Sequence, residues 1–260
     1  MEPRQVSESI EVSMMLTFVG GFLEIYSFIL KGHVFATTIT GNIVMMLFNL
    51  SNKNYAVLIK YIFPIIGFAL GIIISIIVRN KLSGNKLHWR LYVLFIETVL
   101  IFLIYILRAK SVMIVDVCLI SMLSGIQIQT FTKIKKRMYM STMCTGNTRK
   151  LIQHLAYKDY ENAKIFGLII FSFGTGVVCG GYLIRYLKEV SILLMLIPIW
   201  ISGFLVHKNW KKTLNLKDWE LFSIIQNNYD ELFVHHHCLL IDQLIFVVFL
   251  CHQESYFQLL

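Results

Sequence analysis

A glutamate occupies the middle of the first long apolar stretch of this chain. Glu24 lies about midway between Val12 and Leu30, where an ionised carboxylate is costly unless it is paired, protonated or facing water. A carboxylate in such a place typically binds a solute or a proton. The plainer alternative is a protonated acid bonded to a neighbouring helix. Glu24 is therefore the strongest single candidate for a functional side chain.

The tripeptide Thr-Gly-Asn occurs twice, as Thr40-Gly41-Asn42 and as Thr145-Gly146-Asn147. Glycine frees the backbone from helical geometry, Thr and Asn can cap exposed amides, and a helix that begins there aims its positive end at a solute. Broken helices of this kind build solute sites at the midplane of transporters. The alternative is a helix cap or tight packing without any ligand.

The two tripeptides are 105 residues apart, and the same offset superposes other residues. One offset for several matches favours duplication over chance. It also places Gln129 opposite Glu24, so a polar position recurs in both halves. We expect Glu24, Gln129 and the two tripeptides to line a shared interior, with Asn42 approaching Asn147 near the midplane. The further superposed pairs are Gly20 with Gly125, Phe68 with Phe173, and Gly71 with Gly176.

Other chemistry finds no support in the sequence. It contains no GxSxG, HExxH, phosphate-binding glycine loop or GxGxxG after a strand, so we expect no enzymatic activity, no catalytic residue and no cofactor. The five cysteines form no CxxC pair, and three consecutive histidines, 235–237, would point in different directions on a helix. We therefore expect no metal site. Glu97 and Asp116 are interpreted as interfacial or structurally bonded acids.

The composition identifies the solvent around these residues. Hydrophobic residues make up 57% of the 260 and charged residues 15%, with a mean hydropathy of +0.67. This excludes an ordinary soluble globule, which needs more charge on its surface. The net charge of +9 lies in short clusters between apolar runs, so the expected partner is the lipid bilayer and not nucleic acid.

Six apolar stretches are long enough to span a bilayer as helices. Two further segments, 34–50 and 138–155, contain the tripeptides and either cross or re-enter. If they re-enter, the 24 Lys and Arg residues divide 17 to 7 between the faces, and if they cross, 13 to 11. The positive-inside rule favours re-entry. The six stretches are 12–30, 61–78, 91–107, 111–132, 165–184 and 190–206.

The sequence thus predicts an all-α protein of the cell membrane, with six spans as two inverted three-span repeats. The membrane domain covers residues 1–206, with halves at about 10–108 and 111–206, and both termini are cytoplasmic. The loop 133–136 is expected on the cytoplasmic face and the loop 108–110 outside. The tail 207–260 is interpreted as an interfacial helix or an extension, since its apolar run 238–250 is too short to span.

The segment 20–42, GGFLEIYSFILKGHVFATTITGN, and a second Thr-Gly-Asn after SGIQIQTF resemble the YoaK-like family of bacterial multi-pass membrane proteins. The resemblance covers about residues 10–206 and implies six-span topology; the family is catalogued as a domain of unknown function and implies no chemistry. Two departures are present. Glu24 stands where relatives tend to have aspartate, and Gln127-Ile128, followed by Gln129, stands where a Gln-Asn pair is expected.

From these patterns we expect a transporter or channel for a small solute. The alternative is a non-transporting membrane component that binds a lipid or a protein partner, with purely architectural tripeptides. Transport predicts polar groups around one cavity, whereas the alternative predicts that helix hydrogen bonds consume them.

Overall fold

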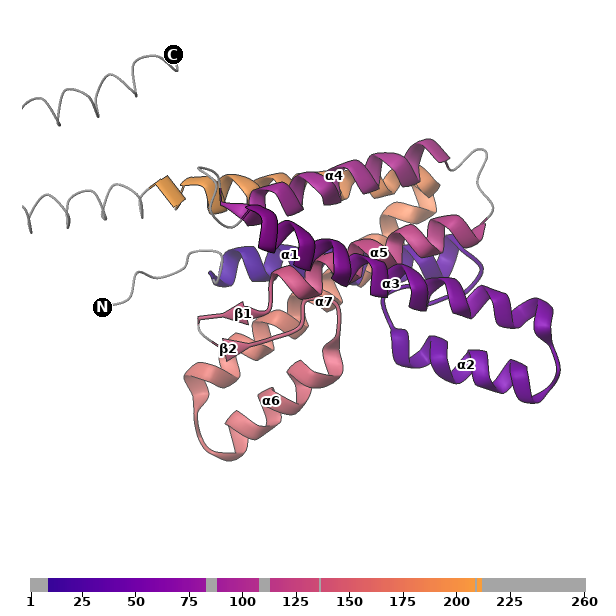
Figure 1. The fold of residues 1–260 in the computed structure, drawn as a ribbon. Coiled ribbons are helices and arrows are strands. Elements are labelled where there is room, and N and C mark those ends of the chain that lie inside the picture. The colour runs from indigo at the N-terminus through magenta and orange to yellow at the C-terminus, as the bar shows by residue number, and fades with distance from the viewer. Residues whose placement is uncertain (1–8, 83–87, 108–112, 136, 209, 212–260) are drawn as a thin grey trace, which may run out of the picture. The chain divides into compact units, whose positions relative to one another are not determined.

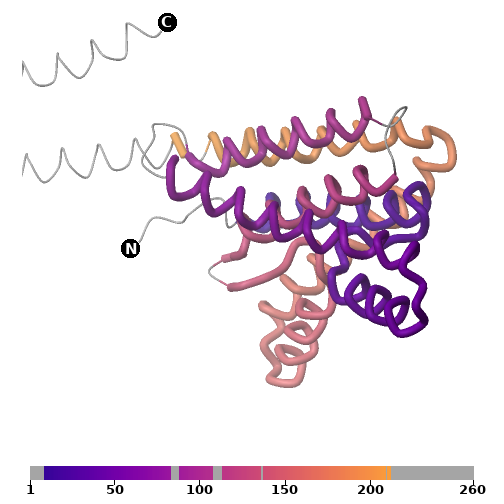
Figure 2. Tube along the Cα trace, turned by 45° about the vertical axis from the view of Figure 1, so that its right-hand side comes forward, coloured from indigo at the N-terminus to yellow at the C-terminus, as the bar shows by residue number. Residues whose placement is uncertain are grey.

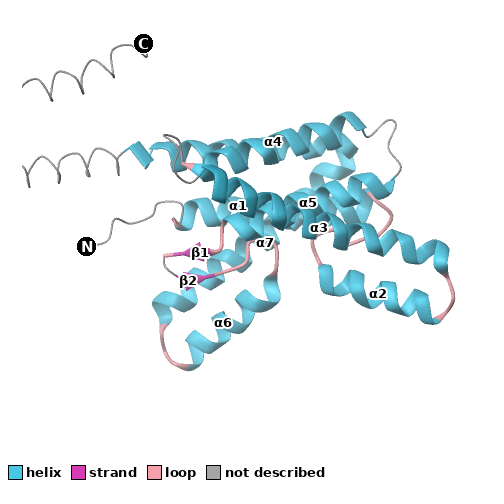
Figure 3. Ribbon diagram, viewed as in Figure 1, coloured by secondary structure: helices cyan, strands magenta, loops and turns pink. Residues whose placement is uncertain are grey.

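The computed structural model describes residues 9–82, 88–107, 113–135, 137–208 and 210–211. Most of this part is helical (Figure 3). The chain divides into the units Met1–Lys211 and Lys212–Leu260, and the second lies outside the described residues, as does most of the expected interfacial tail. The elements are α1 (Ile10–Leu30), α2 (Ile39–Ser51), α3 (Tyr55–Leu82), α4 (Trp89–Leu107), α5 (Met113–Thr130), β1 (Lys133–Ile134), β2 (Arg137–Met138), α6 (Cys144–Ala156), α7 (Tyr160–Leu187) and the 3-10 helix η2 (Lys188–Met195), followed by helical residues 196–208.

Five helical segments are long and apolar enough to cross a bilayer. Four of them are α1, α3, α4 and α5, and the fifth is the stretch Tyr160–Lys208, which contains two of the expected spans. Lys188, between those two, has a φ of +48°, and residues 196–208 run beside α4 (Figures 1 and 2). There Trp200 Nε1 donates to Thr98 Oγ1 at 3.3 Å. The chain is therefore an all-helical membrane protein with five candidate spans in its described part.

The long helices pair closely across the sequence, α1 with α7 and α3 with α5. A Cβ on Gly176 of α7 would lie 2.2 Å from the carbonyl oxygen of Phe18, and one on Gly71 of α3 would lie 2.1 Å from that of Met122. Only glycine permits such backbone contact, which is common between membrane helices. The two glycines are 105 residues apart, whereas their carbonyl partners are 104 apart. Equivalent residues of α1 and α5 are thus 104 positions apart, one fewer than the offset of 105 that relates α3 to α7.

Two short helices, α2 and α6, have 13 residues each and so extend about 20 Å, less than the roughly 30 Å of a hydrocarbon core. Each packs against the long helix that follows it, α2 on α3 and α6 on α7. Both project from the same side of the long helices (Figures 1 and 2). Neither helix is long enough to cross a bilayer by itself.

The turns that follow α2 and α6 are alike. Lys53 and Lys158 both have a φ of +58°, and their backbone amides donate to Leu50 and Leu155 at 3.0 Å. These residues are again 105 apart. The short connection between β1 and β2 belongs to the second half, where Lys133 pairs with Met138 in an antiparallel register.

Candidate functional site

The carboxylate of Glu24 is bonded to the segment that leads into α2. Oε2 accepts hydrogen bonds from the backbone amide of Thr37 at 2.9 Å and from its hydroxyl at 2.5 Å, and Oε1 accepts from the hydroxyl of Thr38. Glu24 is 7% exposed. A residue of α1 therefore holds the chain just before α2.

These bonds are made to Thr37 and Thr38, which precede the first helical residue of α2. Thr38 is the N-cap of α2 and makes no side-chain cap bond, although the amides at a helix start need acceptors. An acidic group at this end is also favoured by the helix dipole. The same turn is fixed by Ser27 Oγ, which accepts from the Ala36 amide at 3.1 Å, and by Ser121 of α5, which donates to the Ala36 carbonyl.

The two tripeptide asparagines make matching contacts. Asn42 Nδ2 donates to the Phe35 carbonyl at 3.0 Å, and Asn147 Nδ2 donates to the Met140 carbonyl at 2.7 Å. Each bond spans seven residues back along the chain. Asn147 also accepts from the Met140 amide at 3.3 Å and donates to Met143 at 3.0 Å. Both amides, each 2% exposed, thus hold the backbone that precedes their helices.

The threonines and glycines of the two tripeptides are less buried than the asparagines. Thr40 and Thr145 are exposed, and Gly41 and Gly146 are half-buried. A Cβ would meet only Thr38 Cγ2 at 3.6 Å beside Gly41 and Met140 Sδ at 3.9 Å beside Gly146, so packing does not require either glycine.

The buried threonines of the helix starts are Thr37 and Thr142, which the sequence argument did not select. Thr142 Oγ1 accepts from Ser124 of α5 at 3.1 Å. A signal for them existed, because Thr37 and Thr142 are also 105 residues apart and stand at the same distance before each tripeptide.

Gln129 is half-buried, and the glutamine that reaches across to the first half is Gln127. Its Nε2 donates to the Leu16 carbonyl of α1 at 2.7 Å. With the one-residue shift between α1 and α5, the position that matches Glu24 is Ile128, which precedes Gln129. The second half therefore has no carboxylate at the place that Glu24 occupies in the first.

The Cys144 thiol at the start of α6 is affected by the charge of Glu24. Burial, and secondly the Glu24 carboxylate, raise the pKa of the Cys144 thiol. Cys144 is the first residue of α6, whereas Glu24 is hydrogen-bonded to the residues before α2. The arrangement can hold a small polar solute or a proton between two positive helix ends, or it can simply cap the helices.

The sequence profile of a family described as "Protein of unknown function (DUF1275)" matches residues 12–205. The chain belongs to this family. It is also similar to the UPF0700 transmembrane protein YoaK of Bacillus subtilis (strain 168), with 22% identity over 204 residues, which are 74% of this chain and 88% of the relative. No solved structure matches. The chain is an integral membrane protein of the YoaK-like kind, as the sequence predicted.

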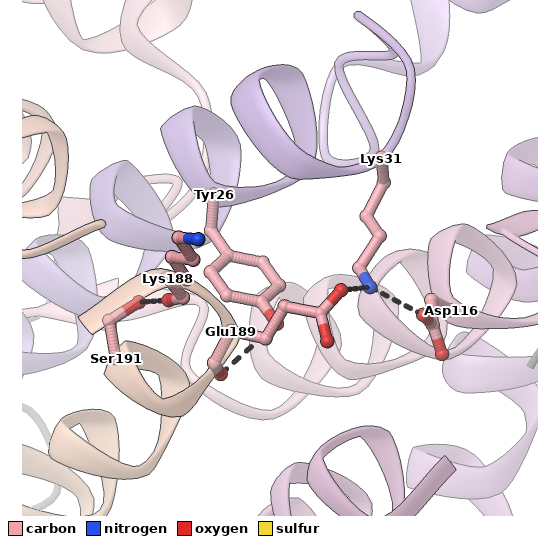
Figure 4. Close-up of polar contacts among 6 residues, drawn as sticks. All are labelled: Tyr26, Lys31, Asp116, Lys188, Glu189 and Ser191. Atoms are coloured by element: carbon pink, nitrogen blue, oxygen red, sulfur yellow. Dashed lines mark hydrogen bonds and ion pairs between the residues drawn. The ribbon is translucent and has the colours of Figure 1, made fainter. Parts of the chain in front are cut away.

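The DUF1275 region also contains an ion cluster that the sequence argument missed (Figure 4). Lys31 Nζ lies 2.6 Å from Asp116 Oδ2 and 2.9 Å from Glu189 Oε1. The side chains of Lys31 and Asp116 are 4% and 1% exposed. Tyr26 donates from its hydroxyl to the Glu189 carbonyl at 3.3 Å. The cluster joins the end of α1 to the starts of α5 and η2, so three distant segments meet in it.

Within the described residues, no group of three His, Cys, Asp or Glu side chains could hold a metal ion. The three histidines 235–237 and the loop 108–110 lie outside those residues, as do residues 1–8 and the tail run 238–250.

Proposed function

We propose that this membrane protein moves a small polar solute across the cell membrane. The site lies between the starts of α2 and α6, and the protein acts without enzymatic chemistry or a cofactor. The observation that carries the proposal is the buried Glu24 carboxylate, which is hydrogen-bonded to the residues before α2.

The proposal includes six spans in two inverted halves, at about 10–108 and 111–206. Three observations support it. The first helix of each half packs against the third helix of the other. Gly71 and Gly176 make the same backbone contact. The turns at Lys53 and Lys158 share one backbone conformation and one hydrogen bond.

The orientation follows from charge. With both termini cytoplasmic, the cytoplasmic face carries 17 of the 24 Lys and Arg residues. The cluster of Lys31 with Asp116 and Glu189 then faces outward, and the β1–β2 connection faces the cytoplasm. On this reading α2 runs from near the midplane toward the outer face, and α6 runs from near the midplane toward the inner face. The positive ends of the two helices therefore oppose each other near the midplane. In that arrangement Asn42 and Asn147 lie near each other.

The geometry suits a solute that exchanges hydrogen bonds with hydroxyls and a carboxylate. Half-helix ends and unwound backbone supply such groups without exposing unpaired amides to lipid. Glu24 is bonded to the residues before α2, and neither Thr38 nor Met143, the N-caps of α2 and α6, makes a side-chain cap bond. Candidate contacts for the solute are Glu24, Gln129 and the residues of both tripeptides.

A second function has an observation in its favour. The amides of Asn42 and Asn147 and the oxygens of Glu24 are bonded to neighbouring protein groups, as an architectural role requires. Six large apolar side chains of α2 are also exposed: Ile43, Val44, Met45, Leu47, Phe48 and Leu50. A non-transporting component that binds a lipid or a protein partner would use such a face.

Uptake into proteoliposomes, measured against a panel of small solutes, distinguishes the two. We expect uptake above empty vesicles for one solute class and its loss in Glu24→Gln, which keeps the shape and removes the charge. The matched control is Glu161→Gln, an exposed glutamate in the first turn of α7. Wild-type vesicles that match empty ones for every solute would favour the non-transporting role. Full uptake by Glu24→Gln would remove Glu24 from the site.

A further inference from the structure

Glu97 is an acid buried in α4. Its exposed fraction is 0%, and within the described residues neither carboxylate oxygen has a hydrogen-bond partner. An ionised carboxylate without partners is among the most costly groups to bury in a membrane protein. A buried acid of this kind therefore needs a proton, a cation or water.

Another buried oxygen within the described residues, Gln127 Oε1, is also without a hydrogen-bond partner. Gln127 lies on α5, which packs against α4, and its amide nitrogen is already fixed by the Leu16 carbonyl. Buried polar groups are rarely left unpaired, and each unpaired one needs a physical account. Glu97 and Gln127 thus lie on two packed helices with side-chain oxygens that lack partners within the described residues.

Tyr139 lies within the electrostatic range of Glu97. Burial raises the pKa of the Tyr139 phenol, Ser13 and Arg90 lower it, and Glu97 raises it again. Burial is the largest of these effects, so the phenol stays protonated and can donate to a carboxylate. The Tyr139 phenol is therefore a protonated group within electrostatic range of Glu97.

Charged and polar groups on α4 and on other helices of the bundle have partners of their own. Arg90, on α4 itself, donates from Nε to the Thr130 carbonyl at 3.2 Å and stacks on Phe131. From α1, Ser13 contributes a hydroxyl that donates to Ser9. Asp116 of α5 is bonded to Lys31, as is Glu189 of η2.

We propose that Glu97 binds a proton reversibly, with Tyr139 as the donor to its ionised form. The proton comes from hydronium in the adjoining water: one O–H bond of hydronium breaks, a water molecule is left, and an O–H bond forms on one carboxylate oxygen. Tyr139 follows the β1–β2 connection, whose residues Lys133 and Lys135 are exposed. This proton site is separate from Glu24 and does not depend on solute transport.

Infrared difference spectroscopy on the full chain in lipid tests the proposal without any solute. We expect a carboxylic-acid C=O band that is lost reversibly as the pH rises and is absent in Glu97→Gln. Glu24→Gln is the matched control and should retain the band. Tyr139→Phe should move the loss to higher pH, because the ionised carboxylate then lacks a donor.

Three outcomes would overturn the assignment. One is that no Glu97-dependent band titrates over the pH range in which circular dichroism shows intact helices. Another is that the band follows sodium concentration at fixed pH, which would make the ligand a metal cation. The third outcome applies if Glu97→Gln does not fold, in which case Glu97→Asp replaces it. We expect a titrating C=O band at a shifted frequency in Glu97→Asp, and a band that stays constant with pH in that variant refutes the proposal.

Discussion

The starts of α2 and α6 are built alike in backbone and differently in charge. Asn42 and Asn147 make the same bond to the chain seven residues earlier. The preceding threonines differ, because Thr37 bonds to a carboxylate and Thr142 to the hydroxyl of Ser124. In both helix starts the asparagine fixes the preceding backbone. The charge there differs because α1 supplies the carboxylate of Glu24, whereas α5 supplies the hydroxyl of Ser124. The start of α2 therefore has an acid beside it, and the matching position beside the start of α6 has none.

The largest expected effect comes from removing the buried ion pair between Lys31 and Asp116, which links α1 to α5. Lys31→Met leaves Asp116 buried without its cation, and we expect a loss of about 3 to 5 kcal/mol of stability, the usual cost of breaking a buried pair. Thermal unfolding in detergent measures it. Lys53→Met is the matched control, because Lys53 is exposed, and the double variant Lys31→Met/Asp116→Asn should recover part of the loss. Equal stability of Lys31→Met and wild type would contradict the role of this cluster.

The two asparagines should differ in strength. Asn147→Ala removes three hydrogen bonds and should cost about 2 to 3 kcal/mol, whereas Asn42→Ala removes one and should cost about 1 kcal/mol. The same unfolding measurement compares the two variants side by side. A larger loss for Asn42→Ala would show that the start of α2 depends on its asparagine more than the contacts indicate.

The helix pairs offer a test in which the halves should behave alike. Gly176→Ala and Gly71→Ala each press a methyl group against a backbone carbonyl and should each cost about 1 to 3 kcal/mol. Gly174 has no neighbour within 4 Å of an added Cβ, so Gly174→Ala should be neutral or stabilise by up to about 1 kcal/mol. If Gly174→Ala were as harmful as Gly176→Ala, close packing would not be the cause.

The smallest expected effect concerns the residues that precede α7 and α3, the helices that follow α6 and α2. Asp159, the N-cap of α7, accepts from Asn162 and contacts His154 at 3.0 Å. Hydrogen bonds from Asn162, and then the charge of His154, lower the pKa of this carboxyl. A lowered folded-state pKa means that its stabilisation is present above the unfolded pKa and is lost as pH falls through the folded one. Asp159→Asn should flatten the acid side of the stability profile slightly. At the matching position before α3 the chain already has Asn54, so Asn54→Ala should leave the pH dependence unchanged.

Sequence alone anticipated the parts of the fold that depend on local composition. Long apolar runs must become helices in lipid, so the bounds of α1, α4 and α5 were predictable to within two residues, whereas α3 begins six residues before the predicted span and ends four after it. The carboxylate of Glu24 was predictable as a buried polar group. Its partner Thr37 was not, because that contact depends on the path of the chain between α1 and α2.

The remaining site features depend on register and on distant contacts. Gln129 follows from a uniform offset of 105, but α1 and α5 correspond at 104, and a shift of one residue on a helix turns a side chain by about 100°. Lys31 and Glu189 lie at helix ends, where charges are expected on either face. Only the folding of three segments together shows that they bond to one another.

The crossed pairing of α1 with α7 and of α3 with α5 has a consequence for synthesis. The ribosome completes α1 long before α7 exists, and at typical elongation rates the wait is on the order of 10 s. During that time the glycine-rich backbone face of α1 has no partner of its own. The first three spans therefore enter the membrane as an unfinished set whose exposed faces need lipid or a chaperone, and a nascent chain stopped after α4 should be a substrate for membrane proteases.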